Sequence, residues 1–98
     1  MTGSYRFKIM EKKIEELLKS GHQAEAIGCL EEYIQQNATD EECLLQLGEL
    51  LYAEGKMTEA LNKFNAVIRL NPKNRKAENY SLMIRNILGY YCKDLLNP

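Results

Sequence analysis

The fold is decided by residues 41–74, EECLLQLGELLYAEGKMTEALNKFNAVIRLNPKN. Leu44, Leu47 and Leu51 recur at steps of three and four residues, so they lie on one face of a helix. Gly55 ends that pattern, and a second apolar stripe follows it. The second stripe consists of Ala60, Phe64, Val67 and Ile68. Two amphipathic helices joined by a tight glycine turn form an αα-hairpin.

The order and spacing of residues in this hairpin resemble a tetratricopeptide repeat (TPR), a helix-turn-helix unit of thirty-four residues. The residues that match the family's pattern are Leu47, Gly48, Ala60, Phe64 and Pro72. Leu44 stands where the family usually has Trp, and Leu51 stands where it usually has Tyr. The C-terminal segment, residues 77–98, AENYSLMIRNILGYYCKDLLNP, also looks like the ending of small TPR proteins from bacteria.

A second copy of the pattern lies thirty-four residues earlier in the chain. Residues 20–26, SGHQAEA, align with residues 54–60, EGKMTEA. The shared glycine permits the left-handed backbone that ends a helix, and the shared alanine lets the two helices of a hairpin approach closely. The opening helix of this copy departs from the family pattern, because Lys13 and Ile14 stand where the second copy has Leu-Gly.

These repeats predict an all-α protein, a right-handed α-solenoid of helix-turn-helix (TPR-like) repeats with a C-terminal capping helix. We expect one domain over 1–98, made of a degenerate TPR repeat at 7–40, a TPR repeat at 41–74, and a capping helix and tail at 75–98. The expected helices are 5–19, 23–36, 40–54, 57–70 and 74–91. Thr39 and Glu42 have the form of a capping box for the third helix, and we expect the tail to leave the last helix near Asp94.

Composition limits the classes of partner and compartment. The 98 residues contain 13 basic and 14 acidic side chains, a net charge of −1. Because nucleic-acid binding needs a basic stripe, this balance predicts no nucleic-acid partner. The chain has no apolar run long enough to cross a membrane, and its N-terminus does not have the pattern of a signal peptide. We therefore expect a cytoplasmic protein without membrane contact.

The residues that catalysis or metal binding requires do not form a recognisable pattern. Cys29, Cys43 and Cys92 are widely spaced, and His22 is the one histidine, so a zinc site is not indicated. Buried, reduced thiols are the simpler interpretation. Neighbouring glutamates point in different directions on a helix, and no glycine-rich phosphate loop occurs. We expect no cofactor, no metal and no enzymatic activity.

The resemblance to TPR proteins implies that the first helix of each repeat lines a concave groove in which a partner's peptide lies. Carried over onto this sequence, the groove positions are Lys8, Glu11, Glu15, Leu18, Glu42, Leu45, Glu49, Tyr52, Lys76, Asn79 and Met83. Leu45 and Tyr52 lie beyond the leucine stripe of their helix, which indicates a contact surface. The alternative is that both side chains pack against a neighbouring helix.

The charges at these positions indicate what kind of partner the groove would hold. A clamp for acidic peptide tails is not indicated, since the corresponding positions include Glu11 and Glu15. The groove glutamates instead favour a basic or amphipathic helical segment of a protein partner. The alternative function is a self-assembling homodimer in which a second copy fills the groove. Candidate contacts for the dimer are Tyr5, Phe7, Tyr90 and Tyr91.

Overall fold

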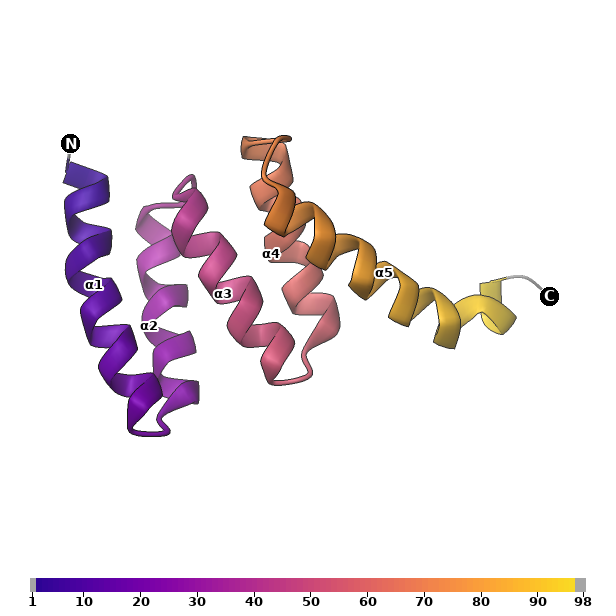
Figure 1. Cartoon of the computed structure of the whole chain (residues 1–98), viewed down its shortest axis with the longest axis horizontal. Coiled ribbons are helices and arrows are strands. Elements are labelled where there is room, and N and C mark those ends of the chain that lie inside the picture. Colours follow the sequence, from indigo (N-terminus) through magenta and orange to yellow (C-terminus); the bar gives the residue numbers. More distant parts are fainter. Residues whose placement is uncertain (1, 97–98) are drawn as a thin grey trace.

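The computed structural model describes the backbone of residues 2–96 and the side chains of residues 10–89. Within the described backbone the regular elements are all α-helices. They are α1 (Thr2–Lys19), α2 (Gln23–Gln36), α3 (Glu41–Ala53), α4 (Met57–Leu70) and α5 (Arg75–Leu96). The helices α1 to α4 stand side by side in chain order, and α5 crosses α4 before leading away from the stack (Figure 1). The predicted all-α solenoid of helical hairpins is confirmed.

Both hairpin turns are made by a glycine in the left-handed region of the backbone. Gly21 has φ = 79° and Gly55 has φ = 81°, and the two lie thirty-four residues apart. In each turn the residue after the glycine donates its backbone N–H to a carbonyl five residues earlier, from His22 to Leu17 and from Lys56 to Leu51. The glycine turns predicted from the repeat are therefore confirmed.

The start of α3 differs from the prediction. The N-cap residue is Asp40, whose Oδ1 accepts the backbone N–H of Cys43 at 3.1 Å, so Thr39 and Glu42 do not form the predicted capping box. An aspartate fits this position because its carboxylate also stabilises the positive end of the helix dipole. The other oxygen of Asp40 accepts the hydroxyl of Tyr33 at 2.8 Å, which ties the cap to α2.

The last helix is also longer than predicted. It was expected to end near residue 91, with the tail leaving the helix near Asp94, whereas α5 continues to Leu96. No proline or turn motif interrupts this segment before Pro98, so local sequence gives the helix no reason to stop earlier. At the other end of the chain, α1 begins at Thr2 instead of the expected residue 5.

The core is a single apolar layer between the paired helices. Its fully buried side chains include Ile14, Leu30, Leu47, Leu51, Phe64, Val67 and Ile84, together with Ala26 and Ala60. The two repeats fill equivalent positions with different sizes of side chain. Gly48 and Phe64 of the second repeat correspond to Ile14 and Leu30 of the first, thirty-four residues earlier, and all four residues are buried. A larger residue on one helix is thus matched by a smaller one on the other, as dense core packing requires.

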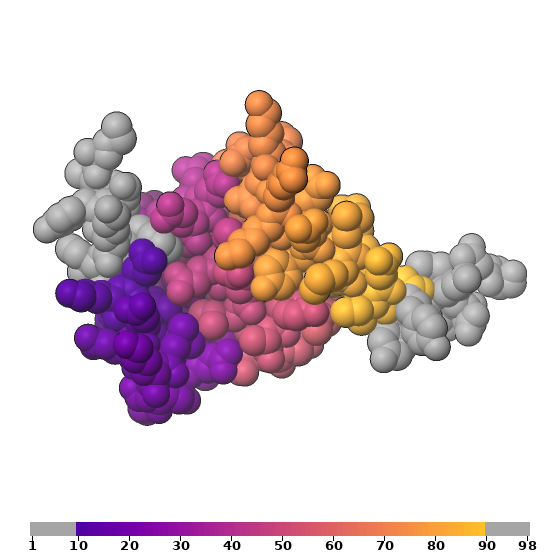
Figure 2. All heavy atoms as spheres, in the orientation of Figure 1, coloured from indigo at the N-terminus to yellow at the C-terminus, as the bar shows by residue number. Residues whose placement is uncertain are grey.

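The helix α5 covers the open side of α4 with one face. The ring of Tyr80 stacks on Phe64 with a centroid distance of 4.6 Å, and the hydroxyl of Ser81 lies 3.3 Å from Asn65 Oδ1. On the opposite face Leu82 and Met83 are 51% and 43% exposed. The yellow part of α5, which stops at residue 89 in Figure 2, projects beyond the other coloured atoms. This helix therefore closes the second repeat while leaving its own outer face uncovered.

Candidate functional site

An open hollow lies between the first helices of the two repeats. It has a volume of about 400 Å³ and is lined by Glu11 of α1 and by Glu42, Leu45, Gln46 and Glu49 of α3. The α3 residues recur at steps of three and four, so they form one strip along the helix. The structure thus brings together Glu11, Glu42, Leu45 and Glu49, four of the positions expected to face the groove.

The hollow is lined by three carboxylates, one amide and one leucine. Glu11 and Glu42 are exposed, Glu49 is half-buried, and Leu45 is half-buried against the core. Three carboxylates beside one leucine side chain favour a negative potential at this site. Such a surface attracts groups that combine positive charge with apolar bulk.

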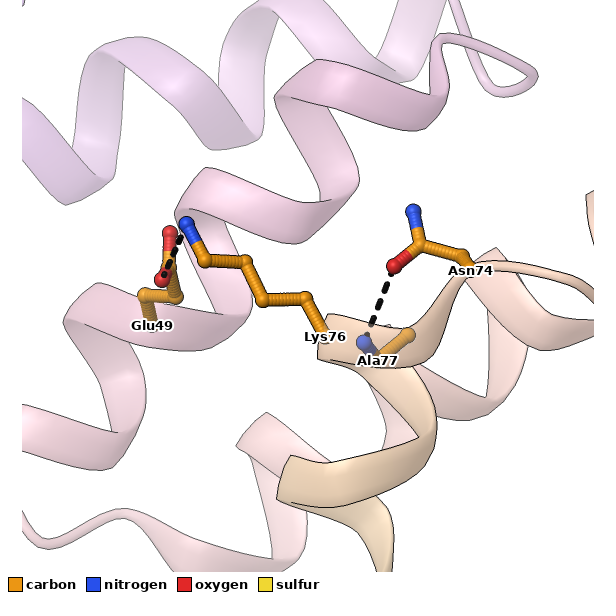
Figure 3. Close-up of polar contacts among 4 residues, drawn as sticks. All are labelled: Glu49, Asn74, Lys76 and Ala77. Atoms are coloured by element: carbon orange, nitrogen blue, oxygen red, sulfur yellow. Dashed lines mark hydrogen bonds and ion pairs between the residues drawn. The ribbon is translucent and has the colours of Figure 1, made fainter.

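The carboxylate of Glu49 also contacts α5. The Nζ atom of Lys76, in the first turn of α5, lies 3.6 Å from Glu49 Oε2 (Figure 3). The Lys76 side chain is 65% exposed and that of Glu49 is 30% exposed. An ion pair this long and this solvated contributes little to folding. Its consequence is electrostatic, because it places a positive charge beside the acidic hollow.

The first turn of α5 is held in place by hydrogen bonds to the start of α3. Asn74 caps α5, since its Oδ1 accepts the backbone N–H of Ala77 at 3.0 Å (Figure 3). The Nδ2 group of the same residue donates to Glu41 Oε2 at 2.6 Å, and that oxygen also accepts from Asn71 Nδ2 at 3.0 Å. The position of the Lys76 backbone relative to α3 is fixed by this network.

An aromatic cluster lies beyond Glu49 at the other end of the groove. Tyr52 meets Tyr80 edge to face at 5.3 Å between ring centroids, and Tyr80 stacks on Phe64. Burial raises the pKa of Tyr80, and the charge of Glu49 with its hydrogen bond to the phenol raises the pKa further. Tyr52 therefore packs against a neighbouring helix, as the alternative interpretation of this residue proposed, and the phenol of Tyr80 stays neutral beside Glu49.

The remaining expected groove residues do not join the hollow. Glu15 on α1 and Asn79 and Met83 on α5 are exposed but line no part of it, and Leu18 is half-buried against the core. Lys8 lies outside the side chains that the structure describes, as do Tyr5, Phe7, Tyr90 and Tyr91, the candidate dimer contacts. Gln46 also lines the hollow; the sequence reasoning considered it only as a position of the clamp for acidic peptide tails and did not include it among the groove-facing residues. Gln46 follows Glu42 by four residues on the same helix, and this spacing indicates that both side chains lie on the same face.

The described thiols differ in their surroundings. Cys43 is fully buried, and burial together with the charge of Asp40 raises the pKa of its thiol to about 12. Cys29 is free and half-buried, so the expectation of a buried thiol holds for Cys43 and only in part for Cys29, while Cys92 lies outside the described side chains.

Within residues 10–89 no three potential metal ligands of the His, Cys, Asp or Glu type come together. No helix among the described residues is long and apolar enough to cross a membrane.

Stacked helical hairpins with a thirty-four-residue period, and an exposed acidic groove across their first helices, define a helical-repeat protein of the TPR-like class. The chain matches the bacterial transcriptional activator domain over residues 2–72, well over half its length, and it belongs to that family. The family has a TPR-like helical fold and a regulatory role in transcription. A search of curated proteins found no match.

The family corrects one expectation from the sequence. We expected nucleic acid to have no part in this protein's partners, and this is wrong, because domains of this family occur in transcriptional activators that bind DNA. The error lies in what net charge can indicate. A balance of 13 basic and 14 acidic residues describes the average field of this domain. It does not report what a regulator containing such a domain binds.

Proposed function

We propose that this domain is a non-enzymatic contact module of transcription regulation, built from TPR-type repeats. In this proposal the hollow between α1 and α3 is the groove that holds a basic or amphipathic helical segment of a protein partner. The partner's positive groups would lie against Glu11 and Glu42, and its apolar side chains against Leu45. A transcriptional regulator of bacteria works where the chromosome lies, so we place the domain in the cytoplasm.

The observation that carries the proposal is the lining of the hollow. Carboxylates from two different helices, Glu11 on α1 and Glu42 on α3, line the same hollow as Leu45. Catalytic sites need a nucleophile, a general base or an activated ligand in a geometry that excludes water. Shallow grooves with an apolar centre and a charged border are typical of helix-in-groove recognition.

The proposal can be tested with a synthetic amphipathic helix of about five turns that carries leucines on one face and lysines on both sides of them. Its binding to the domain is measured by fluorescence anisotropy at low and high salt. Replacing Glu11→Lys and Glu42→Lys together should weaken binding by about tenfold or more, because two attractions become repulsions. The control is Glu31→Lys with Glu59→Lys, which makes the same change of charge on α2 and α4.

Equal losses for the two double variants would mean that only net charge matters and would contradict the groove. Tighter binding of a DNA duplex than of the peptide would also contradict it. The alternative function, self-assembly, is separated by light scattering of the domain alone. A dimer that resists dilution and dissociates when Glu11 and Glu42 are reversed would assign the groove to a second copy.

A further inference from the structure

The groove contains a positive charge that belongs to the domain itself. Lys76 reaches from the first turn of α5 to Glu49 on α3, with 3.6 Å between Nζ and Oε2. Glu49 lines the same hollow as Glu11 and Glu42. Among the described side chains, which are those of residues 10–89, neither Glu11 nor Glu42 takes part in an ion pair. Among the described side chains, Glu49 is thus the carboxylate of the hollow that already has a cationic partner.

The backbone beneath Lys76 is fixed, while its ammonium group is not. Asn74 caps α5 and donates to Glu41 at the start of α3, so the first turn of α5 keeps its place beside α3. The ammonium group ends a flexible stem with 65% of the side chain exposed. A solvated pair of this kind is weak and is readily exchanged for another cation. The geometry thus holds an internal cation close to Glu49 without binding it tightly.

We infer that Lys76 competes with a partner's basic group for Glu49 and so limits the affinity of the groove. This inference rests on the proposed function of the groove. In the free domain Lys76 occupies the carboxylate of Glu49, and a basic side chain of the partner reaches that carboxylate only by displacing it. The charged part of the contact then falls on Glu11 and Glu42, between α1 and α3. The part of the partner that lies towards α5 meets Lys76 and is neutral or apolar.

The test uses the same lysine-flanked leucine helix and the intact domain, with Kd measured by fluorescence anisotropy. Lys76→Gln should tighten binding by about two- to fivefold at low salt, since the carboxylate of Glu49 becomes available and a repulsion is removed. Lys56→Gln is the matched control, because it removes the same charge at the exposed turn between α3 and α4. The control should leave Kd nearly unchanged.

A double-mutant cycle separates competition from a general effect of charge. If Lys76 acts by occupying Glu49, then Lys76→Gln should give little or no tightening in a protein that already carries Glu49→Gln. Equal tightening in both backgrounds, or equal tightening by Lys76→Gln and Lys56→Gln, would overturn the inference and leave the groove intact. Failure of every variant to bind the peptide, Lys76→Gln included, would overturn the proposed function together with this inference.

Discussion

A β-carbon added at Gly48 would lie 2.8 Å from Cε1 of Phe64, closer than any real β-carbon contact. The phenylalanine ring is fully buried, and Tyr80 stacks on it with a centroid distance of 4.6 Å, so a shift of the ring would disturb this second contact. Three helices therefore meet at one ring, with Gly48 on α3, Phe64 on α4 and Tyr80 on α5. The absence of a side chain at position 48 sets the closest approach of α3 to α4.

We predict that Gly48→Ala destabilises the domain by about 1–3 kcal/mol, because overpacking outweighs the gain of about 1 kcal/mol that alanine brings to a helix interior. Gly28→Ala is the matched control. It also lies within a helix, and a β-carbon there meets nothing within 4 Å. That variant should stabilise the domain by about 0.5–1 kcal/mol. Urea unfolding of the two variants checks both signs, and stabilisation by Gly48→Ala would contradict the packing described here.

The first repeat indicates how the clash can be relieved. There, Ile14 occupies the position of Gly48, and Leu30, which is smaller than phenylalanine, occupies the position of Phe64. Phe64→Leu alone should cost about 1–2 kcal/mol, because it leaves a cavity under Tyr80. Combined with Gly48→Ala it should cost less than the sum of the single changes, since the added methyl group fills that cavity. A double-mutant cycle of unfolding free energies measures this coupling. Additive losses of unfolding free energy would show that the methyl group added at position 48 does not fill the space left at position 64.

The asparagine that caps α5, Asn74, should contribute more to the stability of the domain than an exposed asparagine on the same helix. Asn74 accepts the backbone N–H of Ala77 and donates to Glu41, so Asn74→Ala removes a helix cap and a link between α3 and α5. We predict a loss of about 1–2 kcal/mol. Asn86→Ala, at an exposed position of the same helix, should be neutral or slightly stabilising. Thermal unfolding followed by circular dichroism compares the two, and equal melting temperatures would contradict a structural role for the cap.

The buried thiol of Cys43 predicts a loss of stability at alkaline pH. Its pKa is raised from 9.0 to about 12, so the folded protein holds the proton where the unfolded chain has released it. The contribution of the protonated Cys43 thiol to the free energy of unfolding is fully present below pH 9 and decreases as the pH rises from there towards 12. Between about pH 8 and about pH 10.5 the natural sequence should lose about 1–2 kcal/mol of unfolding free energy through Cys43. The Cys43→Ala variant lacks this loss, so its unfolding free energy should decrease less over the same range. Parallel pH profiles for the two proteins would contradict this assignment.

Repeat spacing made most of the fold predictable. Gly21 and Gly55 marked both hairpin turns, and the residues expected between the helices, Ala26, Gly48, Ala60 and Phe64, are all buried. The end of α5 was not predictable in the same way, because a third copy of the pattern was not apparent in the sequence. The start of α3 was misassigned since both Thr39 and Asp40 are good capping residues, and only the backbone geometry selects between them.

The site was predictable in part. The resemblance to TPR proteins supplied the expected groove positions, and four of them, Glu11, Glu42, Leu45 and Glu49, line one hollow. The contacts of Lys76 and Tyr52 could not be predicted, since both are made with residues on other helices. Distances across a groove depend on how the helices cross, and the sequence of one helix carries no measure of that angle.

The sequence alone determined that this chain forms helical hairpins, because apolar periodicity and glycine placement act within a few residues of one another. It also determined which face of each helix is apolar. Only the tertiary structure decided which carboxylates share a hollow, that Lys76 pairs with one of them, and that Phe64 lies close to both Gly48 and Tyr80. These relationships join residues from different helices, so they exist only once packing has fixed the distances between the helices.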